Sequence, residues 1–380
     1  MQQVQVSIPA GARKYQISVG SNLLSKSGKL IRTSLGPSAH RLALISNKKV
    51  FKLYGSIVAE SLNHAGFSVS TWLMREGEAY KSLSTTQQAV SFLSDQGLER
   101  TDGVVALGGG VVGDLAGFAA AIYLRGISFV QIPTTLLAQI DSSIGGKVGV
   151  NLPSGKNRLG AFHQPTGVIA DIDTLQTLPR RELTAGWCEC IKQGAIASRK
   201  LFRLTSDYLA IAQSESIRPS LQLENLISQH CAFKVSIVKG DERENQSRKD
   251  HRSRRILNFG HTVGHALEQL TNYRRFRHGE AVGHGMLVAG ELSKNLGLLD
   301  QSELELLREG VRRCGSLPDA KDLKLASIID ALSLDKKRTG GYVQWVLLER
   351  IGKPRLVSGK DIQPTILRSS IRDALQLGKV

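Results

Sequence analysis

Two stretches near the start of the chain alternate apolar with polar residues. Residues 4–8 place Val, Val and Ile at every second position, and residues 15–19 place Tyr, Ile and Val in the same way. A period of two is typical of a strand with one buried face. Because the intervening segment PAGARK is turn-like, the pattern predicts an opening β-hairpin.

Beyond residue 40, short apolar runs alternate with helical stretches. The runs are predicted to be buried strands, and they lie at 41–46, 67–74, 103–108, 127–133 and 167–173. Strands that alternate with helices form a parallel sheet whose two faces are both covered. The first part of the chain is therefore predicted to be an α/β domain.

After about residue 178 the strand signal fades and helical periodicity dominates. Leu304, Leu307 and Val311, for example, recur on one helical face, and Gly315 follows as a typical end signal. Helices are predicted at 181–210, 220–240, 261–272, 280–297, 302–314 and 322–334. We therefore expect two domains, an α/β domain over 1–178 and an all-α domain over 179–380.

Composition narrows the class of protein. The 380 residues are 41% hydrophobic, and with no run approaching twenty apolar residues no membrane-spanning helix is expected. The N-terminal MQQVQVSIPAG lacks the basic and hydrophobic regions of a secretory signal, so a cytoplasmic location is expected. The scattered cysteines are too few for a disulfide framework and are expected to be free thiols. They are Cys188, Cys190, Cys231 and Cys314.

The chain is strongly basic, with 50 Lys and Arg against 33 Asp and Glu and a formal net charge of +17. Nucleic-acid-binding proteins usually gather such charge in a stripe or tail. Here the one dense cluster is 243–255, and aromatic residues, only 5% of the chain, do not gather beside Lys or Arg. The distribution favours a small anionic substrate over a nucleic acid.

The segment 256–280 gathers the candidate metal chemistry. His261 and His265 are four residues apart and share one helical face, and His278 follows. Imidazoles at this spacing are a metal-site pattern, although an isolated pair fits surface or hydrogen-bonded core histidines equally well. The third His and the flanking glycines favour a divalent cation. A Glu from elsewhere in the chain is then expected as a further ligand.

Glycine-rich turns follow two of the predicted strands. Gly108, Gly109 and Gly110 end one strand and open a helix, where backbone N–H groups and the helix dipole can hold a pyrophosphate. The alternative is a tight turn with no ligand, because the spacing differs from G-x-G-x-x-G. In the second loop, Asp141 and Lys147 flank further glycines at the edge of the sheet where α/β proteins bind ligands.

Taken together, these motifs closely resemble the 3-dehydroquinate synthases, the shikimate-pathway members of the sugar phosphate cyclases. The matching blocks run along nearly the whole chain in order. They are GEAYKS at 77–82, LGGGVVGDLAGFAAA at 107–121, RG at 125–126, PTTLLAQIDSSIGGK at 133–147, GKN at 155–157, TLPRREL at 177–183, DERE at 241–244, LNFGHTVGHALE at 257–268, HGEAV at 278–282 and LDKK at 334–337. The resemblance implies a Rossmann-like nucleotide-binding domain followed by a helical metal- and substrate-binding domain.

The resemblance also implies a metal site for Zn²⁺ or Co²⁺ at Glu189, His261 and His278. His265 and Glu244 would then handle protons, although the residues alone leave His261 and His265 open as the metal pair. Lys192, three residues after Glu189, shares its helical face. Cys188 and Cys190 point about 200° apart on the same helix, so they are expected to be buried thiols and not ligands.

The cofactor implied by the resemblance is NAD. The matching positions are Asn47, Glu78, Lys81, Gly108, Gly109, Gly110, Asp114, Thr134, Thr135, Lys156, Thr174 and Thr177. Asn47 stands where the family often has Asp, and Lys49 lies close by. Because Asn cannot repel a 2′-phosphate as Asp does, the preference for NAD over NADP is left open.

The substrate implied is 3-deoxy-D-arabino-heptulosonate 7-phosphate, a phosphorylated sugar acid, and the product 3-dehydroquinate makes the enzyme a lyase. The matching substrate positions are Arg125, Asp141, Lys147, Asn157, Lys192, Lys234, Arg254, Asn258, His265 and Lys337. Among the residues expected to act in catalysis are His265, Glu244, Lys192, Asp141 and Lys147.

Two further expectations follow from the resemblance. Relatives are commonly homodimers, and no nucleic-acid or membrane partner is expected. The segment between DERE and RRILNFGH is about six residues longer than the common pattern, and the extra residues lie inside NQSRKDHRS. Either Arg254 or Arg255 could then be the phosphate ligand, and Arg254, four residues before Asn258, is the predicted one. The rival interpretations are another sugar phosphate cyclase and a metal-dependent polyol dehydrogenase.

Overall fold

A computed structural model describes residues 1–8, 13–212, 218–245, 247–248, 250, 252–338 and 342–377. The chain divides into two compact units, Met1–Leu178 with Ile217–Lys239, and Pro179–Ser216 with Gly240–Val380. The sequence places a boundary at 178 but assigns the helix at 220–240 to the second domain, whereas the structure packs it in the first unit.

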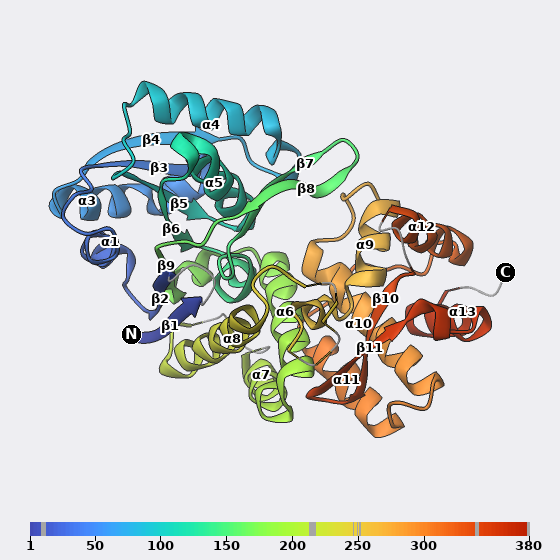
Figure 1. Cartoon of the computed structure of the whole chain (residues 1–380). Helices are drawn as coiled ribbons and strands as arrows, with labels where there is room; N and C mark the ends of the chain where they lie inside the picture. Colours follow the sequence, from blue (N-terminus) through green and yellow to red (C-terminus); the bar gives the residue numbers. More distant parts are fainter. Residues whose placement is uncertain are drawn as a thin grey trace. The chain divides into compact units, whose positions relative to one another are not determined.

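The first unit contains a seven-stranded sheet in the order β1-β2-β9-β6-β5-β3-β4 (Figure 1). The strands are β1 (Gln2–Ile8), β2 (Arg13–Gly20), β3 (Arg41–Asn47), β4 (Ser68–Met74), β5 (Gly103–Gly108), β6 (Ser128–Pro133) and β9 (Gly167–Asp171). β1 and β2 form an antiparallel hairpin, and the other neighbours pair in parallel. The predicted hairpin and parallel α/β sheet are both confirmed.

Helices cover both faces of this sheet, as Figure 1 shows. They are α1 (Ser27–Leu35), α3 (Ser56–His64), α4 (Leu83–Asp95) and α5 (Gly110–Ile122). Helix α8 (Leu221–Gly240) belongs to the same unit. In β3, Ala43 and Ile45 pack in the core cluster that includes α4 and α5, whereas Leu42 and Leu44 pack in the cluster that includes α1 and α3. Alternate side chains therefore serve opposite faces, which explains why the strand is apolar throughout.

The order of the strands creates a ligand edge. β3 leads through α3 to β4 on one side, whereas β5 leads through α5 to β6 on the other. Neighbouring parallel strands whose connections diverge leave a crevice beyond their carboxyl ends, where α/β proteins bind ligands. The glycine turn 108–110 lies at the end of β5, and Asn47 ends β3, so both lie at this switch point.

A second hairpin, β7 (Lys147–Leu152) with β8 (Gly155–Phe162), extends from the predicted Gly-rich loop. The sequence pattern does not predict it, because glycines interrupt the apolar alternation. At Gly149 and Gly160 the two backbones are so close that a Cβ would lie 2.5 Å and 2.3 Å from carbonyl oxygens of the opposite strand. The glycines are thus required for the pairing.

The second unit is mainly helical, as expected. Its helices are α6 (Arg180–Ala197), α7 (Arg199–Ala212), α9 (His261–Leu270), α10 (His278–Asn295), α11 (Gln301–Arg313), α12 (Leu325–Arg338) and α13 (Pro364–Leu375). The single helix predicted at 181–210 is wrong, because Ser198 is extended and accepts the backbone N–H of Leu201 through Oγ, capping α7. A hairpin of β10 (Gln344–Arg350) and β11 (Lys353–Ser358) interrupts the all-α pattern.

Helix α10 packs unusually close to its neighbours. A Cβ at Gly279 would lie 1.9 Å from the carbonyl oxygen of Ala185 in α6, and one at Gly285 would lie 1.8 Å from that of Gly260, which precedes α9. Only glycine permits such backbone contact. No helix in the described ranges is long and apolar enough to cross a membrane.

Candidate active site

Three imidazoles meet where two helices of the second unit begin. His261 opens α9, His265 lies one turn later, and His278 opens α10. Their ligand nitrogens all lie within 4.8 Å of one another. The centroid of the His261 ring is 5.0 Å from that of His278 and 5.3 Å from that of His265. The arrangement can hold a single cation.

Two of these rings are oriented by hydrogen bonds at Nδ1. His261 Nδ1 lies 3.2 Å from the carbonyl oxygen of Phe259, and His278 Nδ1 lies 3.2 Å from Oε2 of Glu268. Because both partners are acceptors, each Nδ1 carries the proton. In the neutral rings, Nε2 then keeps its lone pair for a cation.

The carboxylate of Glu189 completes the group from the middle of α6. It is 0% exposed. Lys192 Nζ is in ion-pair contact with it, and His278 Nε2 lies 3.7 Å from Oε1. Lys192 meets Oε2 of this carboxylate, whereas Oε1 faces His278 Nε2 on the side of the imidazole group. The donor set of two imidazoles and one carboxylate fits a catalytic zinc site with open positions.

The charges around this group favour metal binding. Burial, and then the charge of Lys192, lower the pKa of His261 well below its usual value, so this ring is neutral. Burial also acts to lower the pKa of His278, but the hydrogen bond and charge of Glu268, with the charge of Glu189, outweigh it and raise that pKa. Glu268 and Glu189 thus outweigh the opposing charge of Lys192 at this ring.

The cysteines beside Glu189 take no part in this group. Among the four, Cys188 and Cys190 are 0% exposed, and all are free and buried. A hydrogen bond with Cys314, together with burial, raises the pKa of Cys188 well above its usual value. A thiol held protonated is neither a ligand nor a nucleophile, and the expectation of buried free thiols is confirmed.

In the first unit, the glycine turn opens α5 as a possible anion site. Gly109 is the N-cap residue and has no side chain with which to cap the first turn, so backbone N–H groups open the helix at the edge of the sheet. A Cβ at Gly109 would lie 3.0 Å from Cγ2 of Thr135, and one at Gly110 would lie 3.0 Å from Oγ of Ser142. The turn is therefore packed against the loop that follows β6.

A polar network adjoins this turn. Lys81 Nζ lies 2.6 Å from Oδ2 of Asp114 and 2.6 Å from Oδ1 of Asn157, and Asn151 Nδ2 donates to Oε1 of Glu78 over 2.8 Å. Burial acts to lower the pKa of Lys81, but the charges of Asp114 and Glu78 raise it, so the ammonium stays charged. Glu78, Lys81 and Asp114, which the resemblance assigns to the nucleotide, thus lie together.

Four predicted nucleotide positions, Thr134, Thr135, Thr174 and Thr177, follow the carboxyl ends of β6 and β9. The Thr134 N–H donates to the carbonyl oxygen of Gly108 over 3.0 Å, which fixes the loop after β6 against the glycine turn. Thr174 Oγ1 donates to the carbonyl oxygen of Asp171 over 2.7 Å. Sequence reasoning missed Tyr54, whose hydroxyl contacts Thr177 Oγ1 and donates to the Thr174 carbonyl oxygen over 3.2 Å. Tyr54 therefore holds the segment 174–177 in place.

Comparison with known proteins decides the family. Models of the N-terminal and C-terminal parts of 3-dehydroquinate synthase match residues 71–185 and 186–338. The 3-dehydroquinate synthase of Nostoc sp. PCC 7120 is 43% identical over 353 residues, covering 92% of this chain and 93% of the relative. That of Pelotomaculum thermopropionicum is 44% identical over 357 residues, covering 93% of each.

The chain belongs to the 3-dehydroquinate synthase family. Its members are carbon–oxygen lyases of the shikimate pathway. Membership of the family therefore confirms the expected reaction class and substrate class.

Solved structures agree on the fold. A 2-deoxy-scyllo-inosose synthase in complex with carbaglucose-6-phosphate, NAD⁺ and Co²⁺ has a TM-score of 0.83 at 28% identity, covering 98% of this chain and 99% of that one. The 2-epi-5-epi-valiolone synthase of Streptomyces hygroscopicus, with NAD⁺ and Zn²⁺ bound, has a TM-score of 0.84 at 28% identity, covering 95% and 97%. A glycerol dehydrogenase of Schizosaccharomyces pombe, at 16% identity, TM-score 0.66 and coverage of 95% and 88%, shares the fold alone. The higher identity to 3-dehydroquinate synthases favours that family over the rival cyclases and dehydrogenases.

The predicted substrate positions occur in each of the two units. In the first, Lys234 of α8 is in ion-pair contact with Asp141. In the second, Asn258 Nδ2 lies 3.5 Å from Oε1 of Glu244. Asn157 was predicted to bind substrate but contacts Lys81 of the nucleotide set. Arg125, Lys147 and Lys156 are at least partly exposed, and the side chain of Lys337 lies outside the described residues.

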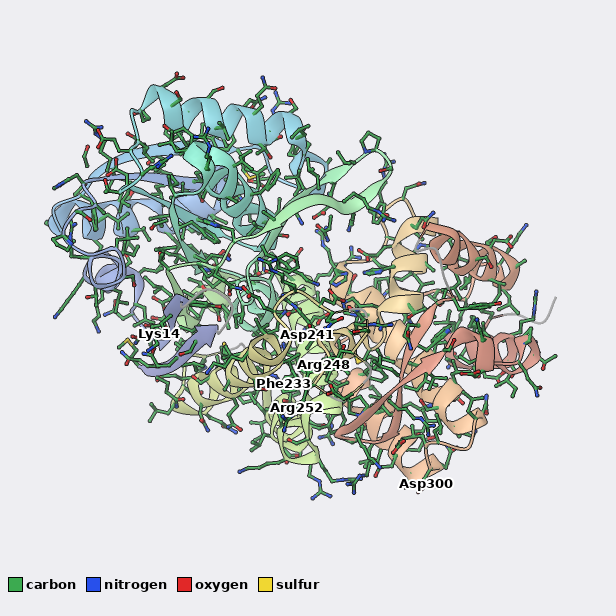
Figure 2. The ribbon with its side chains drawn as sticks, viewed as in Figure 1. Lys14, Phe233, Asp241, Arg248, Arg252 and Asp300 are labelled. Carbon is green, nitrogen blue, oxygen red and sulfur yellow. The ribbon has the colours of Figure 1, made fainter. Side chains whose placement is uncertain are left out.

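Asp241 closes the long basic segment that follows α8. Its carboxylate is 6% exposed and accepts the N–H groups of Asn245 over 2.7 Å and of Arg254 over 2.8 Å. Arg248 reaches the carbonyl oxygen of Gly240, and Figure 2 shows Arg248 and Arg252 beside Asp241. The Asp241 carboxylate thus bonds both the start of this segment, at Asn245, and its end, at Arg254. The added residues therefore do not separate Arg254 from the segment that contains Glu244.

Asn47 has a local structural role. Its Oδ1 accepts the N–H of Val50 over 2.9 Å and caps the helical turn that follows β3. An Asp would cap this turn equally well. The departure from Asp therefore changes the charge at the end of β3 without changing the local fold.

Proposed function

We propose that this chain converts 3-deoxy-D-arabino-heptulosonate 7-phosphate into 3-dehydroquinate and phosphate, with catalytic NAD and one Zn²⁺ or Co²⁺. The observation that carries the proposal is the convergence of the buried Glu189 carboxylate, whose Oε1 lies 3.7 Å from His278 Nε2, with the group of imidazoles. Membership of the family, and relatives solved with NAD⁺ and Co²⁺ or Zn²⁺, support it.

Glu189, His261 and His278 are the proposed metal ligands. The bound cation and NAD supply polarisation of a substrate hydroxyl and its reversible oxidation. Lys192, at 1% exposure and beside Glu189, offers N–H donors to substrate oxygens. His265 is proposed to accept and return a proton within reach of those oxygens, because its ring nitrogen is within 4.8 Å of the ligand nitrogens.

The substrate anions are proposed to meet the basic side chains of the family set. Arg254 Nη1 donates to the carbonyl oxygen of Glu242 over 2.6 Å, whereas Arg255 Nη2 is bonded to Gln344 in β10. Arg254 is the proposed phosphate ligand, as the family resemblance implies. The other proposed contacts are Arg125, Lys147, Asn157, Lys234, Asn258 and Lys337. In the first unit, the glycine turn with Glu78, Lys81 and Asp114 is proposed to hold NAD.

A turnover experiment tests this function. The purified protein with Zn²⁺ would receive the heptulosonate phosphate in excess over a small amount of NAD⁺. Release of phosphate and formation of dehydroquinate should be equal, and each should exceed the NAD⁺ supplied many times over. Steady accumulation of NADH, with glycerol or with the sugar phosphate, would contradict the proposal and favour a dehydrogenase.

His265→Ala separates the two possible metal sets. If Glu189 is the third ligand, the variant should bind zinc near one equivalent while kcat falls about 100- to 10,000-fold, the usual contribution of an acid/base group. Zinc content after gel filtration, measured beside steady-state kinetics, checks both expectations. Loss of zinc would show that His265 is a ligand and that the assignment is wrong.

The remaining expectations belong to the same proposal. We propose a cytoplasmic homodimer, which light scattering of the purified protein tests. Because the end of β3 carries Asn47 and not an acid, the rates with NAD⁺ and NADP⁺ should be compared directly. Asn47→Asp should then raise the preference for NAD⁺ if this position faces the adenosine ribose.

A further inference from the structure

We infer that Glu268 is a positioning residue that orients His278 for the metal. This inference rests on the proposed metal site. Glu268 lies in α9, seven residues after His261, and seven residues are close to two helical turns. His261, His265 and Glu268 therefore lie on one face of α9. The helix that supplies one ligand thus also supplies the group that holds the other.

The contact between Glu268 and His278 has the geometry that orientation requires. Glu268 is 2% exposed, and its Oε2 lies 3.2 Å from His278 Nδ1. The opposite nitrogen, Nε2, lies 3.7 Å from Oε1 of Glu189. A carboxylate on Nδ1 fixes the tautomer, holds the plane of the ring and makes Nε2 a stronger donor to a metal.

His261 receives a different kind of support. Its Nδ1 lies 3.2 Å from the carbonyl oxygen of Phe259, which is neutral and belongs to the backbone. No substitution removes that acceptor, whereas Glu268 can be replaced. The hydrogen bond that orients His278 can therefore be removed by mutating Glu268, whereas the one that orients His261 cannot be removed by a substitution.

A turn after α9 brings Glu268 close to the start of α10. The Tyr273 N–H donates to the Glu268 carbonyl oxygen over 2.8 Å, and Asn272 and Tyr273 adopt left-handed conformations with φ of 50° and 57°. This tight turn reverses the chain just after Glu268. His278 and Glu268 are brought together by local chain geometry and by the close packing of α10 on α9.

Glu268→Ala and Glu268→Gln test the inference, with zinc affinity measured by competition with a chromophoric chelator. Glu268→Ala should weaken zinc binding about 10- to 100-fold, the usual effect of losing such a partner. Glu268→Gln keeps an acceptor oxygen but not the charge, so its loss should be smaller. The absorption spectrum of the Co²⁺-loaded protein should shift in both variants, which a purely structural role would not cause.

Glu280→Gln is the matched control. Glu280 is also a buried carboxylate of the second unit, at 1% exposure, but it pairs with Arg181 over 2.7 Å and accepts the Arg277 N–H. This variant should lose thermal stability without losing zinc affinity. Wild-type zinc affinity and an unshifted Co²⁺ spectrum in both Glu268 variants would overturn the inference. Retention of zinc by Glu189→Ala would instead overturn the proposed metal site, so the two failures are distinguishable.

Discussion

Replacing Glu189 by Gln is expected to abolish stoichiometric binding of the divalent cation. It should lower kcat/KM by at least about 1,000-fold, the upper range found when one group that stabilises developing charge is removed. The amide oxygen carries no charge, and Lys192, which is in ion-pair contact with Glu189, would then face the cation without its counter-ion. Zinc content after gel filtration and steady-state kinetics measure the two effects.

Cys190→Ala is the control for this substitution. Cys190 is buried in the same helix but points to a different face, so its loss changes the core without changing the metal site. The control should keep one equivalent of zinc. If Glu189→Gln also kept one equivalent and turned over at the wild-type rate, the carboxylate would have no role as a ligand.

Gly285→Ala is expected to move α10 away from α9 and to weaken metal binding through that movement. The new Cβ would lie 1.8 Å from the carbonyl oxygen of Gly260, and backbone cannot move aside as a side chain can. Overpacking of this kind typically costs about 1–3 kcal/mol and occasionally more. Because Gly260 directly precedes His261 and His278 opens α10, the two imidazoles should separate and zinc affinity should fall.

Gly290→Ala is the control that separates the effect of the backbone clash at Gly285 from the effect of a higher helix propensity. Both substitutions remove a glycine from α10, so each gains about 1 kcal/mol of intrinsic helix stability. At Gly290, however, the nearest atoms are methyl groups of Leu304 and Leu307 at 2.9 Å, which can rotate. Chemical denaturation and zinc titration should show a much smaller loss for Gly290→Ala. Equal behaviour of the two variants would show that the backbone contact is not required.

The parts of the fold that were predicted from sequence are those whose signal is local. Unbroken apolar runs predict β3 and β5. Alternation of apolar and polar residues in two neighbouring segments predicts the hairpin of β1 and β2. The β10–β11 hairpin was missed because Trp345, Val346, Leu347 and Leu348 are all buried, so the run shows no alternation that distinguishes a strand from a helix.

The same distinction holds for the candidate site. The spacing of His261 and His265 is visible in the sequence because helical periodicity makes it meaningful. Glu189 lies far earlier in the chain, and only tertiary packing of α6 against α10 through Gly279 brings it near His278. Without the resemblance to known synthases, nothing in its neighbourhood marks it as a ligand. Tyr54 and Glu268 were missed for the same reason, because their roles consist of contacts formed only in the folded chain.

The central claim is that Glu189, His261 and His278 share one cation while His265 does not bind it. X-ray absorption at the zinc edge of the loaded protein tests it most directly, because it counts coordinated imidazoles. The account predicts two imidazoles, with Zn–N distances of about 2.0–2.1 Å, in the wild type and the same two in His265→Ala. Three imidazoles in the wild type, falling to two in His265→Ala, would contradict it.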